Sequence, residues 1–147
     1  MKGEYKMCEI QVADREIPES NICFTIPLPP VTKKNSQRIA NCGRYHKILP
    51  SKAYERYEKD VGVFLPCRGR KLNRPCEIVC LFYMKTRHAV DLTNLLEAVD
   101  DVLVKYEVLE DDNSRIIVSH DGSRVLYDKQ RPRTEVTIRF LDGKETA

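Results

Sequence analysis

Residues 91–112, which read DLTNLLEAVDDVLVKYEVLEDD, decide how the rest of this chain is interpreted. Apolar side chains recur there at the 3.6-residue period of an α-helix, at Leu92, Leu95, Leu96, Val99, Leu103 and Tyr106. The opposite side carries Asn94, Glu97, Asp101 and Lys105. The pattern predicts an amphipathic helix with Asp91 as its N-cap and one face packed into a core.

Acidic residues flank and line this predicted helix. Asp91 stands before it, Glu97 and Asp101 lie one turn apart on its polar side, and Asp111 and Asp112 follow it. Carboxylate oxygens are the ligands that magnesium prefers, whereas zinc is bound mostly by histidine and cysteine. If these side chains converge, they form a magnesium site.

Charge is segregated along the chain. Residues 31–75 carry twelve basic and three acidic side chains, whereas residues 91–112 carry one basic and eight acidic side chains. A basic segment that binds phosphates beside an acidic site that binds metal is what an enzyme acting on a polyanion needs. Charge alone equally allows a second interpretation, in which two solvated regions of opposite sign pair with each other.

The order of the predicted elements indicates an α/β fold. Strands are expected at 22–28, 77–86, 115–119 and 134–141, with a further extended stretch after a turn at Asp121-Gly122, and helices at 51–65 and from 91 onward. The apolar run 78–84 indicates a strand that is buried on both faces. The order predicts a two-layer structure with a mixed sheet of about four strands and two main helices.

The length of 147 residues fits one domain, with residues 1–20 as an N-terminal arm and 142–147 as a tail. No apolar run approaches the roughly 20 residues of a membrane span, and the N-terminus lacks the hydrophobic centre of a signal peptide, so we expect a cytoplasmic protein. The six cysteines include no CxxC motif, and we interpret them as buried or free thiols.

The segment 31–50 is long and basic, as is typical of a functional loop. Candidates for contact with a DNA backbone are Lys33, Lys34, Asn35 and Arg38, with a small hairpin around 41–43 and Tyr45 as a stacking surface. A solvated loop is the alternative. Arg87 and His88 precede Asp91 and are further candidates for phosphate contact. His120 is a poorer candidate for a catalytic base, because a histidine before Asp-Gly is typical of a turn.

Residues 91–114 resemble the signature of the RusA family of Holliday junction resolvases, in which a DxDN stretch opens a helix that bears a lysine and an aspartate and is followed by a DD pair. Asp91, Asn94, Asp101, Asp111 and Asp112 stand on motif positions. The resemblance implies a RusA-like fold and a homodimer that cuts four-way DNA junctions with magnesium in recombination and repair, in a phage or prophage setting. It also implies that Asp91 and Asp112 are magnesium ligands. The residues themselves already favour Asp112 as the ligand beyond the helix, with Asp111 as the second choice.

This chain departs from the family signature at two positions. Thr93 replaces the second aspartate, and Glu97 replaces the lysine. We expect Glu97 to serve as the missing ligand, so the predicted catalytic residues are Asp91, Glu97, Asp101 and Asp112, and the predicted metal ligands are Asp91, Glu97, Asp111 and Asp112. The alternatives are a family member that binds branched DNA without cutting it, and a nuclease for other branched DNA.

Overall fold

The computed structural model describes residues 21–34 and 37–142, so the predicted arm 1–20 and most of the predicted tail lie outside the described residues. In chain order the elements are β1 (Ile22–Ile26), β2 (Arg38–Cys42), β3 (Tyr45–Leu49), α1 (Lys52–Val61), the 3₁₀ turn η1 (Gly62–Phe64), β4 (Cys76–Met84), α2 (Leu92–Lys105), β5 (Ile117–Ser119), β6 (Arg124–Tyr127) and β7 (Arg133–Phe140).

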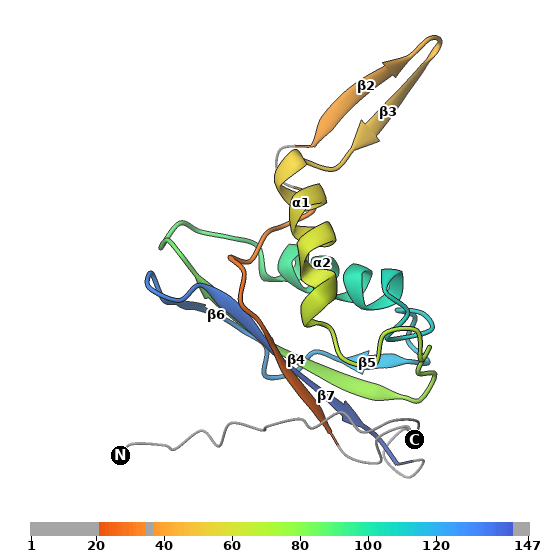
Figure 1. The fold of residues 1–147 in the computed structure, drawn as a ribbon, viewed down its shortest axis with the longest axis vertical. Helices are drawn as coiled ribbons and strands as arrows, with labels where there is room; N and C mark the ends of the chain where they lie inside the picture. Colours follow the sequence, from red (N-terminus) through yellow and green to blue (C-terminus); the bar gives the residue numbers. More distant parts are fainter. Residues whose placement is uncertain (1–20, 35–36, 143–147) are drawn as a thin grey trace.

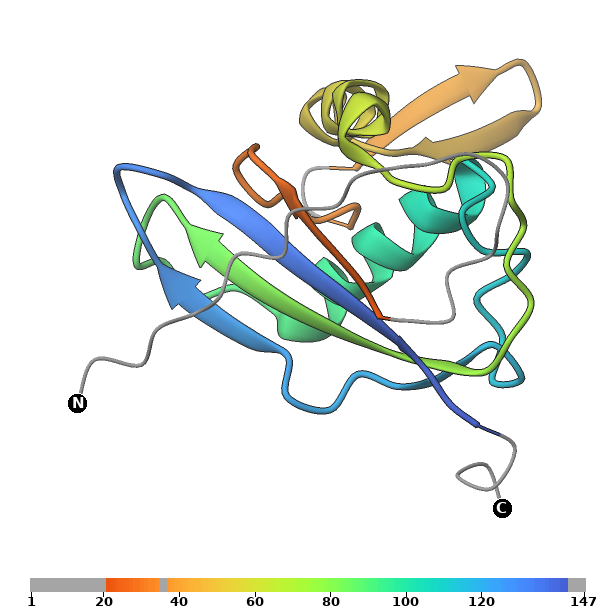
Figure 2. The same cartoon turned by 60° about the horizontal axis from the view of Figure 1, so that its bottom comes forward.

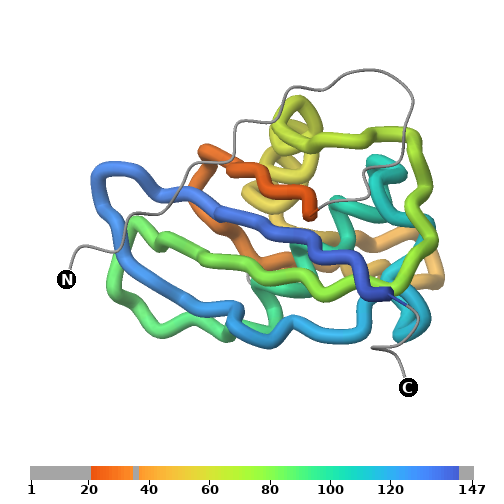
Figure 3. Tube along the Cα trace, turned by 90° about the horizontal axis from the view of Figure 1, so that it is seen from below, coloured from red at the N-terminus to blue at the C-terminus, as the bar shows by residue number. Residues whose placement is uncertain are grey.

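One mixed sheet forms the first layer, and α1 and α2 form the second layer on one of its faces (Figure 1). The strand order is β1-β7-β4, and both β5 and β6 pair with the remaining edge of β4. β7 is antiparallel to β1 and β4, whereas β5 and β6 run parallel to β4. Because β5 and β6 follow one another along the same edge, the sheet is four strands wide (Figure 3). The predicted α/β fold, with a mixed sheet of about four strands and two main helices, is confirmed.

The predicted turn at Asp121-Gly122 is present, but it does not reverse the chain as a hairpin turn would. Gly122 has a φ of +87°, which a glycine adopts without strain. The turn interrupts the edge strand between β5 and β6, and at the interruption the Ser123 hydroxyl accepts a hydrogen bond of 3.0 Å from the Cys80 N–H. The side chain thus replaces a missing backbone acceptor.

Burial alternates along β4. Ile78, Cys80 and Phe82 are buried beneath the helices, whereas Val79 and Leu81 on the other face are half-buried. The prediction that both faces of this strand are buried is therefore wrong for the described part of the chain. An apolar run of this kind does not show which of its faces a second layer covers.

Both helices bury the faces that their sequence pattern predicts. The N-cap of α1 is Ser51, whose hydroxyl accepts a 3.1 Å hydrogen bond from the Tyr54 N–H. α1 buries Tyr54, Tyr57 and Val61, and α2 buries Leu95, Ala98, Val99, Val102 and Leu103. The regular part of the first helix ends at Val61 rather than at residue 65, and η1 completes it. The main core lies between these helix faces and the sheet.

β2 and β3 pair with each other as a separate two-stranded sheet that projects beyond α1 (Figure 1). Gly43 at the tip has a φ of +63°. The small hairpin predicted around residues 41–43 is thus confirmed, and it is longer than expected. We call residues 38–49 the β2–β3 arm.

None of the described helices is long and apolar enough to cross a membrane. Cys76 and Cys80 are buried free thiols, and burial raises the pKa of both, that of Cys76 to about 11. These two residues fit the interpretation of the cysteines as thiols.

Candidate active site

Asp91 begins α2 at the junction with the connection from β4. Its Oδ1 accepts a hydrogen bond of 2.5 Å from the Thr93 hydroxyl and one of 3.0 Å from the Thr93 N–H. These bonds lower the pKa of Asp91, because they stabilise the carboxylate. The predicted N-cap is confirmed. The exposed Asp91 side chain carries a negative charge, and Thr93, at the position of the family's second aspartate, helps to hold it.

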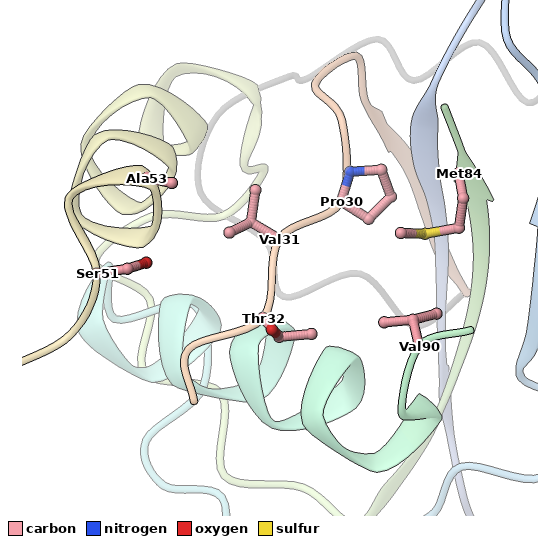
Figure 4. Close-up of a pocket in the computed structure, with 7 residues that line it drawn as sticks. All are labelled: Pro30, Val31, Thr32, Ser51, Ala53, Met84 and Val90. Carbon is pink, nitrogen blue, oxygen red and sulfur yellow. The ribbon is translucent and has the colours of Figure 1, made fainter. Parts of the chain in front are cut away.

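An open cavity of about 260 Å³ lies between the N-terminal end of α1, the end of β4 and the residue before Asp91 (Figure 4). Its lining residues are Pro30, Val31, Thr32, Ser51, Ala53, Met84 and Val90. The walls are mostly apolar, with the hydroxyls of Thr32 and Ser51 as polar groups. The connection that delivers Asp91 therefore borders a hollow rather than a closed core.

Two lysines cover the polar side of α2. Lys33 Nζ lies 2.7 Å from Asp101 Oδ2, and Lys34 Nζ lies 2.7 Å from Glu97 Oε2. The hydrogen bond that Lys33 donates to Asp101 is the largest cause of the raised pKa of Lys33. The lysines offset the repulsion between two acids one turn apart. Two predicted catalytic residues are thus paired with two predicted DNA-binding residues, which agrees with the interpretation of opposite charges that pair.

Asp111 and Asp112 lie beyond the other end of α2. Asp111 accepts hydrogen bonds from the Asn113 side chain at 2.6 Å and from the Asp112 N–H at 2.8 Å, and these bonds lower its pKa. The preceding segment is tied to the residues before β4, since the Lys71 N–H donates to the Glu107 carbonyl at 2.8 Å. Asp111 and Asp112 are therefore both exposed near the start of β4.

The length of α2 separates the predicted metal ligands into two groups. Asp91 precedes its first turn, and Asp111 and Asp112 follow its last turn. A helix of 14 residues is about 21 Å long, and α2 lies along one face of the sheet (Figure 2). The chain turns back after α2, and Asp112 lies near enough to Asp100 within the helix to raise the pKa of that residue. Among the described residues, no three His, Cys, Asp or Glu side chains are grouped so that they could hold a metal ion. A single chain does not bring Asp91 together with Asp111 and Asp112.

The other predicted DNA-binding residues are spread around the Asp91 end. Arg87 lies over the Tyr127 ring at 4.0 Å from its centroid, and His88 is exposed. Arg38 at the root of the β2–β3 arm pairs with Glu55 of α1 at 2.8 Å. Asn35 lies outside the described residues. In the chain, Arg38 and the β2–β3 arm come shortly before α1, and Arg87 and His88 come shortly before α2.

The structure adds a half-buried pair that the sequence analysis did not predict. His120 Nε2 lies 2.8 Å from Asp100 Oδ2, and His120 Nδ1 lies 3.0 Å from the Ile78 carbonyl. Because that carbonyl only accepts, Nδ1 carries a proton, so a second proton must lie between Nε2 and the Asp100 carboxyl. The other carboxyl oxygen, Oδ1, is buried and has no hydrogen-bond partner among the described residues. Asp100 and His120 therefore share a proton inside the fold.

Both members of this pair hold protons more tightly than they would in water. Burial raises the pKa of Asp100, and the nearby charges of Asp112 and Asp101 add to the increase. Burial disfavours the charged His120 ring, but the hydrogen bond and charge of Asp100 leave its pKa above the ordinary value. The sequence gives one sign of this pair, because the acidic Asp100 lies beside the apolar face of the predicted helix. The sequence does not show that His120 is its partner.

The fold and its acidic residues first define a class of protein. It is an α/β protein with exposed carboxylates before and after one helix and with basic residues in the neighbouring segments. Carboxylates that can bind metal ions and basic residues that can bind phosphates are the groups used in the hydrolysis of nucleic acids. The family follows from comparison. The chain belongs to the RusA endodeoxyribonuclease family, whose model matches residues 27–139. The match covers every predicted site residue and confirms the predicted family, so the chain is of a nuclease family. No curated protein matches this chain.

Proposed function

We propose that this protein resolves Holliday junctions by magnesium-dependent hydrolysis of two phosphodiester bonds in DNA recombination and repair. The observation that carries the proposal is the family match over residues 27–139, because the family is one of endodeoxyribonucleases. The exposed carboxylates at Asp91, Asp111 and Asp112 support it, since all three stand on motif positions and are free to meet solvent.

The carboxylates fit magnesium by their chemistry, because magnesium prefers oxygen ligands and often keeps only one or two protein carboxylates. In the described part of one chain, however, no three of them are grouped so that they could hold a metal ion. We therefore infer that the Asp91 end of one chain meets the Asp112 end of a second chain. Magnesium bound there supplies an activated water and neutralises the leaving oxygen.

A two-fold homodimer satisfies this requirement twice. In a two-fold interface, each contact between one end of a chain and the other end of its partner occurs in two equivalent copies. Two equivalent acidic centres fit two cuts in strands of like polarity at a four-way junction. The dimer is thus proposed for two independent reasons, the symmetry of the substrate and the separation of the ligands.

Lys33 and Lys34, which pair with two acids of α2, can exchange partners when DNA binds. Lys33 and Lys34 have half-exposed side chains, and an exposed ion pair is worth only about 0–1 kcal/mol. Phosphates can therefore replace Asp101 and Glu97 at little cost. In this proposal the lysines, Arg38, Arg87, His88 and Asn35 bind the DNA backbone, Glu97 becomes available as a ligand and Asp101 as a catalytic residue.

Junction cleavage by wild type and Asp91→Asn, with and without magnesium, tests the function. We expect paired nicks with wild type and magnesium, none with a chelator, and a loss of about 100-fold or more with Asp91→Asn, since even residues that support metal ligands contribute 10- to 100-fold. Glu110→Gln, which removes an exposed acid beside the DD pair, is the matched control and should cleave normally. A wild-type protein that binds junctions but never cuts them would favour the binding-only alternative.

The same assay tests Glu97. Glu97→Gln keeps the size of the side chain while it removes the charge. If Glu97 binds the metal directly, the variant enzyme should lose most of its activity. If Glu97→Gln cuts four-way junctions as fast as wild type, Glu97 is not the missing ligand. A wild-type preference for flapped or forked DNA over four-way junctions would instead favour the second nuclease alternative.

A further inference from the structure

The β2–β3 arm is open to solvent on both faces within the described part of the chain. Its strands pair with each other in a register that sets Ile39 opposite Ile48 and Cys42 opposite Tyr45. Every residue of both strands is exposed or half-buried. Figure 1 shows the arm extending beyond α1 and away from the main sheet.

Large apolar side chains lie on both faces of the arm. Tyr45 is 79% exposed, Ile39 73% and Ile48 65%. Paired residues of an antiparallel ladder share a face and successive residues alternate, so the two isoleucines form a pair on one face and Tyr45 lies on the other. Exposed apolar groups on a projecting segment mark a contact surface. Because both faces carry them, the arm suits insertion between two surfaces better than docking on one.

The root of the arm is fixed to the body. Arg38 pairs with Glu55 of α1 at 2.8 Å and donates a 3.2 Å hydrogen bond to the Pro50 carbonyl. Nearer the tip, His46 and Asn41 are joined across the strands at 2.7 Å. These contacts offset the marginal stability of a two-stranded hairpin in water and set the direction in which its tip points.

The charge of the arm selects the kind of partner. Residues 38–49 include Arg38, Arg44 and Lys47 and no acidic residue. A second copy of the arm would bring like charges together, whereas DNA combines phosphates with apolar base faces. Base faces are covered by stacking within a duplex and become accessible where the stack is interrupted. A branch point therefore offers base faces for the apolar side chains of the arm and phosphates for its basic side chains.

We propose that the β2–β3 arm enters the centre of a branched DNA, with the Ile39–Ile48 pair and Tyr45 covering base pairs on its two sides and with Arg44 and Lys47 binding the flanking phosphates. This assignment rests on the proposed function, because it takes branched DNA as the substrate. It adds that the arm, rather than the acidic residues, recognises the branch.

A four-way junction with 2-aminopurine beside the branch point tests the arm, with binding measured in chelator so that no strand is cut. Wild type should raise the fluorescence of the branch probe and leave a probe within a duplex arm unchanged. The paired change Ile39→Ser with Ile48→Ser, and Tyr45→Ala, should remove most of the increase and weaken junction binding about tenfold or more, because base stacking is lost. Their affinity for plain duplex should stay within about twofold, since the basic residues remain.

Val63→Ser is the matched control, because Val63 is 75% exposed but lies in η1 on the body of the protein. It should behave as wild type, and thermal unfolding should show that all variants fold. Arm variants that retain the full increase in fluorescence would overturn the proposal, as would variants that alter the oligomeric state and leave the fluorescence unchanged. If wild type binds junctions but leaves the probe unaffected, only the arm assignment fails. If wild type does not bind junctions, the proposed function fails as well.

Discussion

His120 gives a prediction at the scale of single residues. Its pKa is raised from the ordinary 6.5, so the folded protein favours the protonated ring, and this stabilisation is fully present below pH 6.5 and is lost as the pH rises through the raised value. The raised pKa of Asp100 changes stability with pH in the same direction, because the fold also favours the protonated form of Asp100. We expect His120→Asn to lower the free energy of unfolding by about 1–3 kcal/mol at pH 6 and by less at pH 8.5.

Denaturant unfolding of wild type and His120→Asn at several pH values measures this difference. His88→Asn is the control, because it removes a histidine whose side chain is exposed. A penalty that stays constant between pH 6 and pH 8.5 would show that the Asp100–His120 pair does not carry the shared proton.

The residue scale also shows what the sequence could not supply. Helical periodicity assigns Glu97 and Asp101 to the polar side of α2, and the structure agrees. Periodicity does not say that Lys33 and Lys34 cover that side, because those residues arrive through a connection about 60 residues away in sequence. The partner of Asp100 was missed for the same reason, since only the pairing of β5 with β4 brings His120 to α2.

At the scale of elements, the contact between the end of α1 and Tyr106 beyond α2 gives a second prediction. A Cβ added to Gly62 would lie 2.6 Å from the Tyr106 ring, whose hydroxyl donates a 2.7 Å hydrogen bond to the Glu58 carbonyl. The backbone at Gly62 is right-handed helical, with a φ of −55°, so alanine is opposed by packing alone. We expect Gly62→Ala to reduce the free energy of unfolding by about 1–3 kcal/mol.

A double-mutant cycle separates this clash from other effects of the substitution. Tyr106→Leu removes the ring atoms that a Cβ at Gly62 would meet, so adding Gly62→Ala to it should cost little or should stabilise the helix. Thermal unfolding of the two single variants and the double variant provides the measurement. An equal loss from Gly62→Ala in both backgrounds would contradict the packing explanation.

The elements themselves follow closely from the sequence. Asp91 is predicted as an N-cap because its side chain can accept from the exposed N–H groups of a first turn, and it does so, as does Ser51 at the start of α1. The alternation of Val136, Ile138 and Phe140 in β7 likewise predicts its buried face. The prediction for β4 was wrong because an apolar run in the sequence does not show whether other layers cover one face of the strand or both. The interruption after Asp121-Gly122 could not be told from a hairpin turn, because both use the same residues.

At the scale of the whole molecule, the proposed active centre depends on how the carboxylates are brought together. The motif is contiguous in sequence, yet Asp91 precedes the first turn of α2 and the DD pair follows its last turn. Because these acids are close in sequence, we expected them to form one metal site, but the described part of a single chain holds no group of three such ligands. If the centre forms between two chains, each centre takes Asp91 from one chain and Asp112 from the other.

Mixing two inactive variants tests this arrangement directly. Consider a dimer of an Asp91→Asn chain with an Asp112→Asn chain. One centre would take both altered residues and lose both carboxylates. The other centre would take Asp91 from the Asp112→Asn chain and Asp112 from the Asp91→Asn chain, so it would keep both carboxylates. We expect each variant alone to be inactive and the mixture, after exchange of subunits, to introduce single nicks but no paired cuts in a four-way junction with magnesium. Mixing Asp91→Asn with Asp91→Gln is the control and should stay inactive, because no combination restores that position. If exchange is shown by a tagged subunit and the Asp91→Asn and Asp112→Asn mixture still does not nick, each centre must be built within one chain, and α2 or its flanking segments must then rearrange on DNA to close the distance.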